Sequence, residues 1–218
     1  MDEDAIWYFD YLSPFPYLQL ARFGELPDGL RIKPTPVLFA AMLNHWGHKG
    51  PAEIPAKKRQ TYFYSCWLAE QRNLPFAGPP HHPFNPLAVL RLTIAAGSGI
   101  DCVRMIYERI WGEGANPESP ETLARLAAEL GIADAQVVLV DHKVKETLRV
   151  NTQQAIAAGV FGVPTFLCDG ELFWGDDSTS LFLAFLKDRE MFRRDPYLRL
   201  GQISASAERV AGVAKTTA

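Results

Sequence analysis

Apolar and polar positions at the start of the chain predict a strand, a helix and an extended segment. Ala5–Phe9 is an apolar and aromatic run typical of a buried strand, and Ser13–Pro16 ends it. Apolar residues then recur at helical spacing over Tyr17–Gly24. Leu30–Leu38 contains two prolines among alternating residues, which predicts an extended segment that leads out of the sheet.

The middle of the chain has helical spacing and few strand signals. Ala56–Arg72, Pro86–Ala96 and Cys102–Trp111 are each expected to form a helix. Ser119, followed by a proline, is a helix-start signature with the serine as N-cap. Stretches rich in proline and glycine separate these helices. We therefore expect an inserted helical subdomain over residues 39–135.

The last part of the pattern predicts a helix, a hairpin and a closing helix. Asp141–Ala158 has the spacing of a polar helix. Val163–Leu167 and Glu171–Trp174 predict two short strands, and Asp169–Gly170 between them is a strong hairpin signal. Ser178–Phe192 is expected to close the fold as an amphipathic helix.

Together these elements predict an α/β protein with a thioredoxin-like fold that a large helical insertion interrupts. In this interpretation residues 1–38 and 136–200 form one discontinuous thioredoxin-like domain, and residues 39–135 form the insertion. Residues 201–218 are rich in Ala, Ser and Thr and are expected to be a disordered tail.

Composition and charge favour an ordinary globular protein. Of the 218 residues 48% are hydrophobic and 22% charged, and the net charge is −3, which gives no reason to expect nucleic acid or an anionic membrane as a partner. No apolar run is long enough to span a membrane, and the acidic start does not resemble a secretory signal. The three cysteines form no C-x-x-C pair, so we expect a reduced, cytoplasmic setting.

Ser13 is the first candidate for chemistry because it lies where a strand gives way to a helix. Taken alone, a serine followed by Pro14 is more simply an N-cap. The chain contains no G-x-S-x-G elbow, which disfavours a serine hydrolase. A hydroxyl that donates a hydrogen bond to a bound thiolate fits better, because a donor to the charged form lowers the pKa of a thiol.

Two later segments are further candidates. Taken alone, Val163–Pro164 is more simply a trans proline at the start of an edge strand. In Phe173–Asp177 either aspartate, taken singly, is more simply an N-cap. The functional alternative is that a carboxylate here binds an ammonium group while backbone amides hold a carboxylate. The γ-glutamyl end of glutathione carries both groups.

Six segments that span most of the chain carry a family resemblance. They are FDYLSPFPYL (9–18), PAKKRQTYF (55–63), FNPLAVLR (84–91), WGEG (111–114), VKETLRVNTQQAIAAGVFGVPTF (144–166) and DGELFWGDD (169–177). Together they resemble the 2-hydroxychromene-2-carboxylate isomerase family, which is related to kappa-class glutathione transferases and more distantly to DsbA oxidoreductases. The last two segments are highly specific.

The resemblance implies that glutathione is the cofactor. Ser13 matches the family's catalytic serine, which stabilises the glutathione thiolate. Val163 matches the residue before a cis-proline, here Pro164, and its backbone pairs with the cysteinyl part of glutathione. The segment matching the one that holds the γ-glutamyl group consists of Trp174, Gly175, Asp176 and Asp177.

The helical insertion is expected to cover a second pocket, for the substrate. Its candidate residues are Lys57, Phe84 and Asn85, with His81, His82 and Trp111 also considered. For Lys57 a solvated surface position is equally expected. His81–His82 has no other ligand at metal spacing, so no metal site is expected. Trp111 and the Tyr62–Tyr64 cluster are expected in the core.

The family isomerases carry a substrate-contacting lysine in the segment that corresponds to Phe39–Asn44, where this sequence has no basic residue. The resemblance therefore leaves open whether the substrate is a chromene carboxylate or another compound. The preferred function is cis/trans isomerisation of a conjugated aromatic keto acid in aromatic-compound breakdown. The glutathione thiolate adds reversibly, so glutathione is not consumed.

Three alternatives use the same motifs differently. In a kappa-like glutathione S-transferase the thiolate leaves with the electrophile. A non-catalytic glutathione-binding module would bind the same tripeptide without turnover. Dithiol exchange needs two cysteines, which SPFP at the start of the first helix does not have. A homodimer is expected, as in the related proteins.

Overall fold

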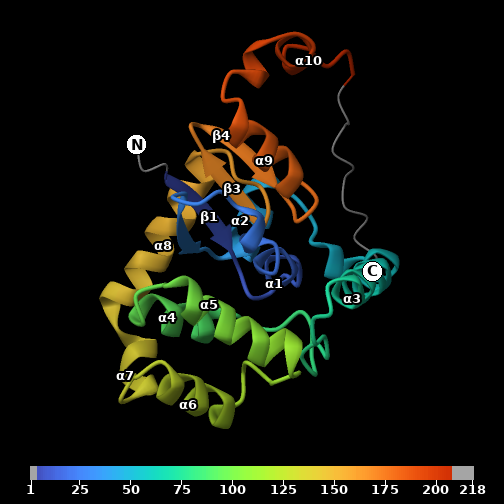
Figure 1. Ribbon diagram of the computed structural model, residues 1–218. Helices are drawn as coiled ribbons and strands as arrows, with labels where there is room; N and C mark the ends of the chain where they lie inside the picture. The colour runs from blue at the N-terminus through green and yellow to red at the C-terminus, as the bar shows by residue number, and fades with distance from the viewer. Residues whose placement is uncertain (1–3, 208–218) are drawn as a thin grey trace, which may run out of the picture. The chain divides into compact units, whose positions relative to one another are not determined.

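A four-stranded sheet with the order β2-β1-β3-β4 organises the protein, whose computed structural model describes residues 4–207 (Figure 1). Its strands are β1 (Asp4–Phe9), β2 (Arg31–Pro36), β3 (Thr165–Cys168) and β4 (Glu171–Trp174). β1 pairs in parallel with β2 and antiparallel with β3, and β3 pairs antiparallel with β4. The two ends of the chain sequence therefore meet in one sheet, as the divided pattern predicts.

β2 is the extended segment predicted at Leu30–Leu38, but it lies within the sheet instead of leading out of it. It pairs with β1 over its whole length, from Asp4 opposite Arg31 to Phe9 opposite Pro36. A strand with two prolines is tolerated because β2 is an edge strand. Pro34 and Pro36 are two residues apart, so their missing N–H groups fall on the same side of the strand.

The helices follow the expected positions closely in the middle of the chain. They are α1 (Phe15–Leu20), α2 (Phe39–Trp46), α3 (Pro55–Gln71), α4 (Leu87–Ala95), α5 (Ile100–Tyr107), α6 (Pro120–Glu129), α7 (Ala135–Val140), α8 (His142–Ala157), α9 (Thr179–Lys187) and α10 (Tyr197–Gly201). The helices α2, α7 and α10 were not expected individually from the sequence. α9 ends at Lys187, before the predicted Phe192, and a separate short turn follows at Met191–Arg193.

Two local predictions are confirmed in detail. Ser119 caps α6, since its Oγ accepts a hydrogen bond of 3.1 Å from the Thr122 N–H. Asp169 and Gly170 both have positive φ, 51° and 85°, as a tight hairpin turn between β3 and β4 requires.

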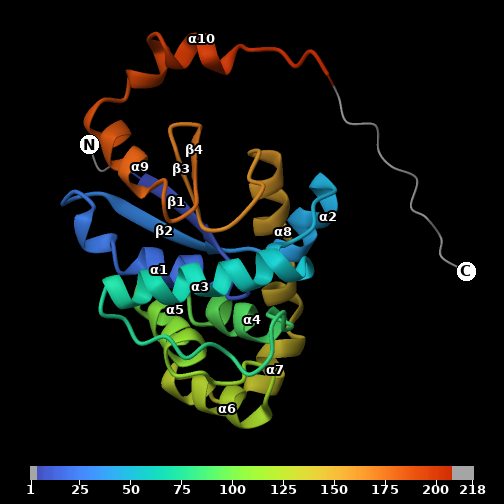
Figure 2. The same ribbon diagram turned by 90° about the vertical axis from the view of Figure 1, so that its right-hand side faces the viewer.

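An aromatic core packs around the central strand. The rings of Trp7 and Phe9 on β1 are fully buried and stacked, with centroids 5.0 Å apart. Phe166 of β3 stacks on Phe182 at 4.5 Å. Figures 1 and 2 show α1 lying between the sheet and the helices α4 and α5 of the insertion, with α6 and α7 further out. The start of α1 is thus enclosed by both parts of the fold.

The chain divides after Phe182 into two compact units, Met1–Phe182 and Leu183–Ala218. This division does not follow the predicted boundaries at residues 38 and 135, which stay predictions. Of the predicted disordered tail, residues 208–218 lie outside the described residues, and Gly201 is the last residue of α10. Across residues 4–207 no helix is both long and apolar enough to cross a membrane.

Candidate functional site

The three candidate segments of the sequence lie at one end of the sheet. β1 and β3 are antiparallel and pair Tyr8 with Thr165, so the chain leaves β1 toward Ser13 where it enters β3 from Pro164. β4 ends at the same place, because Trp174 pairs with Thr165. The topology therefore brings together residues that are more than a hundred positions apart in sequence.

The Ser13 hydroxyl is available to a ligand. Its N–H donates to the Asp10 carbonyl at 3.1 Å, and its Oγ accepts a long bond of 3.4 Å from the Phe15 N–H. The hydroxyl proton has no acceptor among the described residues, and the side chain is 9% exposed. The N-cap residue of α1 is Pro14, so Ser13 precedes the helix instead of capping it.

The Val163–Pro164 peptide bond is cis, in agreement with the family resemblance. The backbone N–H and carbonyl of Val163 have no hydrogen-bond partner within residues 4–207. The Pro164 carbonyl, in contrast, accepts a bond of 2.8 Å from the Gly175 N–H. Val163 therefore offers a free donor and acceptor, and Pro164 ties this loop to the turn after β4.

The turn after β4 separates the two aspartates. Asp176 is buried, and its carboxylate accepts two bonds from Arg72, of 2.8 and 2.7 Å. Asp177 is exposed, and a Cβ added to Gly175 would lie 2.4 Å from its Oδ1. Gly175 has φ of 91°, so glycine is needed here on both counts. Of the two predicted carboxylates, only Asp177 is free of an ion pair with another part of the described chain.

Trp174 forms an aromatic wall beside Val163. Its side chain is 53% exposed, and its ring lies against Gly162, where an added Cβ would be 2.4 Å from the indole Nε1. Phe161 contacts the same indole edge to face, with centroids 5.0 Å apart. The Trp174 ring therefore covers Gly162, the residue before Val163.

Gln19 links α1 to this turn, and sequence reasoning did not identify it. Its buried amide donates to the Gly175 carbonyl at 3.1 Å and to Thr179 Oγ1 at 3.0 Å, and it accepts from Trp7 Nε1 at 2.7 Å. A glutamine between two buried leucines of a helix is the signal that could have found it. The contacts fix the helix that follows Ser13 relative to Asp177.

The helical insertion holds the turn that presents Ser13. The carbonyls of Asp10, Tyr11 and Leu12 accept hydrogen bonds, in that order, from Tyr107 Oη at 2.8 Å, Trp111 Nε1 at 2.8 Å and His82 Nε2 at 2.7 Å. Trp111 is fully buried, as expected. Burial lowers the pKa of His82, which keeps its ring neutral near pH 7. The insertion thus holds the turn that precedes Ser13 through three hydrogen bonds to consecutive carbonyls.

Asp10 is a second residue of the site that the sequence did not reveal. Its side chain is fully buried, and its carboxylate accepts bonds from the Leu12 N–H at 2.9 Å and the Phe39 N–H at 2.8 Å. Burial raises the pKa of this carboxyl to about 7, against the opposing effect of the two N–H donors.

The predicted substrate residues are only partly brought to the site. Phe84 is buried, and its ring contacts His82 at 6.1 Å between centroids. Asn85 accepts from the Leu87 N–H at the start of α4 and borders a hollow of about 280 Å³ that does not include Ser13. Lys57 is exposed, while Lys58 turns inward and donates to the His82 carbonyl at 2.6 Å.

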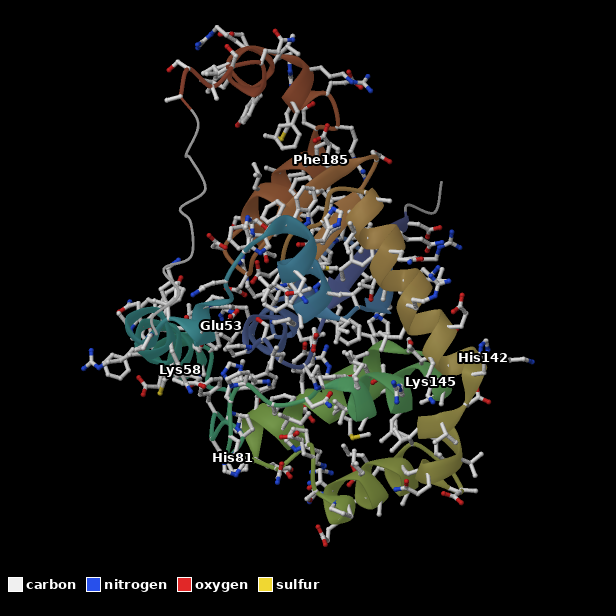
Figure 3. The ribbon with its side chains drawn as sticks, turned by 180° about the vertical axis from the view of Figure 1, so that it is seen from behind. Glu53, Lys58, His81, His142, Lys145 and Phe185 are labelled. Carbon is white, nitrogen blue, oxygen red and sulfur yellow. The ribbon has the colours of Figure 1, made fainter. Side chains whose placement is uncertain are left out.

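Figure 3 shows Lys58 on α3 and His81 at the outer edge of the loop before α4. The expectation of a core position for the Tyr62–Tyr64 cluster is wrong for two of its rings, since Phe63 is 54% and Tyr64 40% exposed. The reason is that α3 packs through Ser65, Leu68 and Ala69, which lie on another face of the helix.

A family model described as a DSBA-like thioredoxin domain matches residues 6–187. The chain belongs to this family. The fold expected from the sequence is therefore confirmed, and this DSBA-like thioredoxin domain has a serine and no cysteine at the start of α1.

Several relatives share most of the length of this DSBA-like domain. The 2-hydroxychromene-2-carboxylate isomerase of Pseudomonas putida is 27% identical over 179 residues, which cover 78% of this chain and 88% of the relative. Glutathione S-transferase kappa 1 of Rattus norvegicus is 26% identical over 208 residues, covering 84% and 91%. A solved structure of 2-hydroxychromene-2-carboxylate isomerase superposes with a TM-score of 0.74 at 23% identity, covering 87% of this chain and 97% of that chain.

Proposed function

We propose that this protein is a glutathione-dependent cis/trans isomerase of the 2-hydroxychromene-2-carboxylate isomerase type. The observation that carries the proposal is that two sets of groups without a partner in the described chain lie at the same end of the sheet. They are the Ser13 hydroxyl proton and the backbone N–H and carbonyl of Val163. The first suits a thiolate and the second suits a peptide. Similarity to named isomerases over 78% of the chain supports the same function.

Glutathione would lie along the Val163 loop. Its cysteinyl N–H and carbonyl pair with Val163 as an added strand, which directs the sulfur toward the start of α1. Its γ-glutamyl ammonium binds the exposed Asp177 carboxylate, because Asp176 is already paired with Arg72. The backbone amides of the turn hold the γ-glutamyl carboxylate.

Ser13 would donate a hydrogen bond to the sulfur and so favour its anion. The thiolate adds to the conjugated carbon of the substrate, a C–S bond forms, and the π electrons move onto the carbonyl oxygen. The former double bond is now single and rotates. The electrons then return, the C–S bond breaks, and glutathione is released unchanged.

Asp177→Asn is expected to weaken glutathione binding about tenfold, since replacing a charge-assisted bond by a neutral one costs about 1.4 kcal/mol. Isothermal calorimetry with reduced glutathione measures this change. Asp28→Asn removes an exposed acid in a different loop and is the matched control. No binding heat in the wild-type protein would contradict the proposed cofactor.

A kappa-like glutathione S-transferase is the second candidate, favoured by the similarity to the rat enzyme over 84% of the chain. The two functions differ in the fate of the sulfur. Recovery of all glutathione after complete conversion of a conjugated keto acid is the outcome for an isomerase, and a stable thioether is the outcome for a transferase. Binding without any turnover of either substrate class would indicate a non-catalytic binding module.

A further inference from the structure

The peptide group immediately before Ser13 is held at both ends. Its carbonyl, on Leu12, accepts the bond of 2.7 Å from His82 Nε2. Its N–H, on Ser13, donates to the Asp10 carbonyl at 3.1 Å. The Leu12 N–H, one peptide earlier, donates to Asp10 Oδ1 at 2.9 Å. Rotation of the peptide that sets the direction of the Ser13 side chain would break at least one of these bonds.

We propose that Asp10 and His82 are positioning residues for the Ser13 hydroxyl, and that the ionised Asp10 carboxylate is the form that holds the hydroxyl toward its ligand. The two residues grip Leu12 from opposite sides, one through its N–H and the other through its carbonyl. The role in thiolate stabilisation rests on the proposed glutathione function. The grip on the turn does not.

The charge of Asp10 matters because both of its oxygens accept backbone N–H bonds. Oδ2 accepts from Phe39 at the start of α2, and Oδ1 accepts from Leu12. An ionised carboxylate satisfies both donors, whereas a protonated carboxyl places an O–H on one oxygen and weakens one of the two bonds. Protonation therefore loosens either the Ser13 turn or its link to α2.

The surroundings of Asp10 make this titration fall near neutral pH. The titratable groups that face it are Tyr11 on its own turn and Tyr107 on α5, and burial raises the pKa of both well above the usual value. From α2, the Phe39 N–H donates to Asp10 Oδ2 at 2.8 Å. No lysine or arginine forms an ion pair with Asp10 within residues 4–207. Burial without a cation raises its pKa to about 7.

His82 acts as a constant donor over the same range. A carbonyl only accepts, so Nε2 carries the proton and Nδ1 is the bare nitrogen, which is buried without a partner. Burial and the nearby Lys58 lower the pKa of the ring. Tyr62, Phe84 and Trp111 surround it and fix its direction. Of the two hydrogen bonds that hold Leu12, the one to Asp10 is therefore the one that depends on pH.

The positioning role of Asp10 and its effect on stability depend on pH in opposite ways. The pKa of Asp10 is raised from 3.8 to about 7 in the folded protein, so this group contributes stability at low pH that is lost as the pH rises through about 7. The positioned form, in contrast, accumulates as the pH rises through the same value. Stability and catalytic competence should therefore change in opposite directions.

The first test uses the protein without ligand. In two-dimensional amide NMR, the Leu12, Ser13 and Phe39 N–H signals should titrate together with a midpoint near 7, and this titration should be absent in Asp10→Asn. The unfolding free energy of Asp10→Asn, relative to that of the wild type, should increase between pH 4 and 7 and stay constant above pH 7. Asp28→Asn should show neither effect.

The second test uses glutathione and substrate. Asp10→Asn, which resembles the protonated acid, should bind glutathione within about twofold of wild type and turn over about tenfold more slowly above pH 7. In the wild type, the turnover rate divided by the thiolate fraction, which ultraviolet absorbance measures, should rise with pH around 7. In Asp10→Asn this rise should be absent. His82→Ala should slow turnover similarly. His82→Gln keeps an N–H donor at the same reach and should recover at least half of the rate.

Amide signals of Leu12 and Ser13 that do not titrate between pH 5 and 9 would overturn the proposal. An unchanged turnover and pH profile in Asp10→Asn would also overturn it. If wild-type protein binds no glutathione but the amide titration is present, the proposed cofactor fails while the grip of Asp10 on the Ser13 turn stands.

Discussion

Ser13→Ala is expected to lower turnover by about 10²-fold or more while leaving the affinity for glutathione within a few-fold of wild type. The backbone edge of Val163 and the Asp177 carboxylate bind the tripeptide in this proposal, and neither depends on the hydroxyl. The loss falls on the thiolate, to which the Ser13 hydroxyl donates in the proposed complex. Steady-state kinetics and the ultraviolet titration of bound thiolate measure the two effects.

The matched control for this variant is Ser180→Ala. Ser180 is exposed on α9 and accepts a bond of 3.1 Å from Arg22. It should keep the wild-type rate. Equal rates for Ser13→Ala and Ser180→Ala would remove Ser13 from the mechanism, and a higher thiol pKa without a loss of rate would place the chemical step elsewhere.

Arg72→Met is expected to lower the free energy of unfolding by about 3 to 5 kcal/mol. Arg72 makes two bonds to the buried Asp176 carboxylate and a third, of 2.8 Å, to the Leu18 carbonyl of α1. Its removal leaves a buried charge without a partner beside the turn that carries Asp177. Urea denaturation measures the loss, and glutathione affinity should fall with it because this turn is no longer held.

Two further variants test the cause of that loss. Arg31→Met breaks an exposed pair with Asp4, 61% and 65% exposed, and should cost less than about 1 kcal/mol. Arg72→Met combined with Asp176→Leu removes both charges and should recover a substantial part of the lost stability. If the double variant is no more stable than Arg72→Met, the loss comes from packing and not from an unpaired carboxylate.

The sequence predicts best those features of the fold that neighbouring residues determine. Ser119–Pro120 starts α6 and Asp169–Gly170 turns between β3 and β4, and both are set by neighbouring residues. The helices α2, α7 and α10 were not foreseen individually. α3 was predicted as a helix, but its apolar residues do not gather on one face, so which face is buried depends on what packs against it.

The candidate site divides in the same way. Ser13, Val163, Pro164 and the 174–177 turn were predicted as site residues because together their motifs carry the family resemblance, and the structure brings these segments to one end of the sheet. The grip on the Ser13 turn was not predicted, because His82 is 70 residues from Leu12. The ion pair that occupies Asp176 joins residues 104 apart, and no local pattern distinguishes Asp176 from Asp177.

The amino-acid order alone thus determined the α/β class and the divided thioredoxin-like arrangement, and it predicted three loops as the binding site of a thiol-bearing peptide. Only the tertiary structure decided which aspartate is free of an ion pair, that burial raises the pKa of the Asp10 carboxyl to about 7, and that the inserted helices hold the serine turn. The physical reason is that burial and long-range hydrogen bonds arise only when distant segments pack, whereas strand ends, turns and caps are settled by a few adjacent residues.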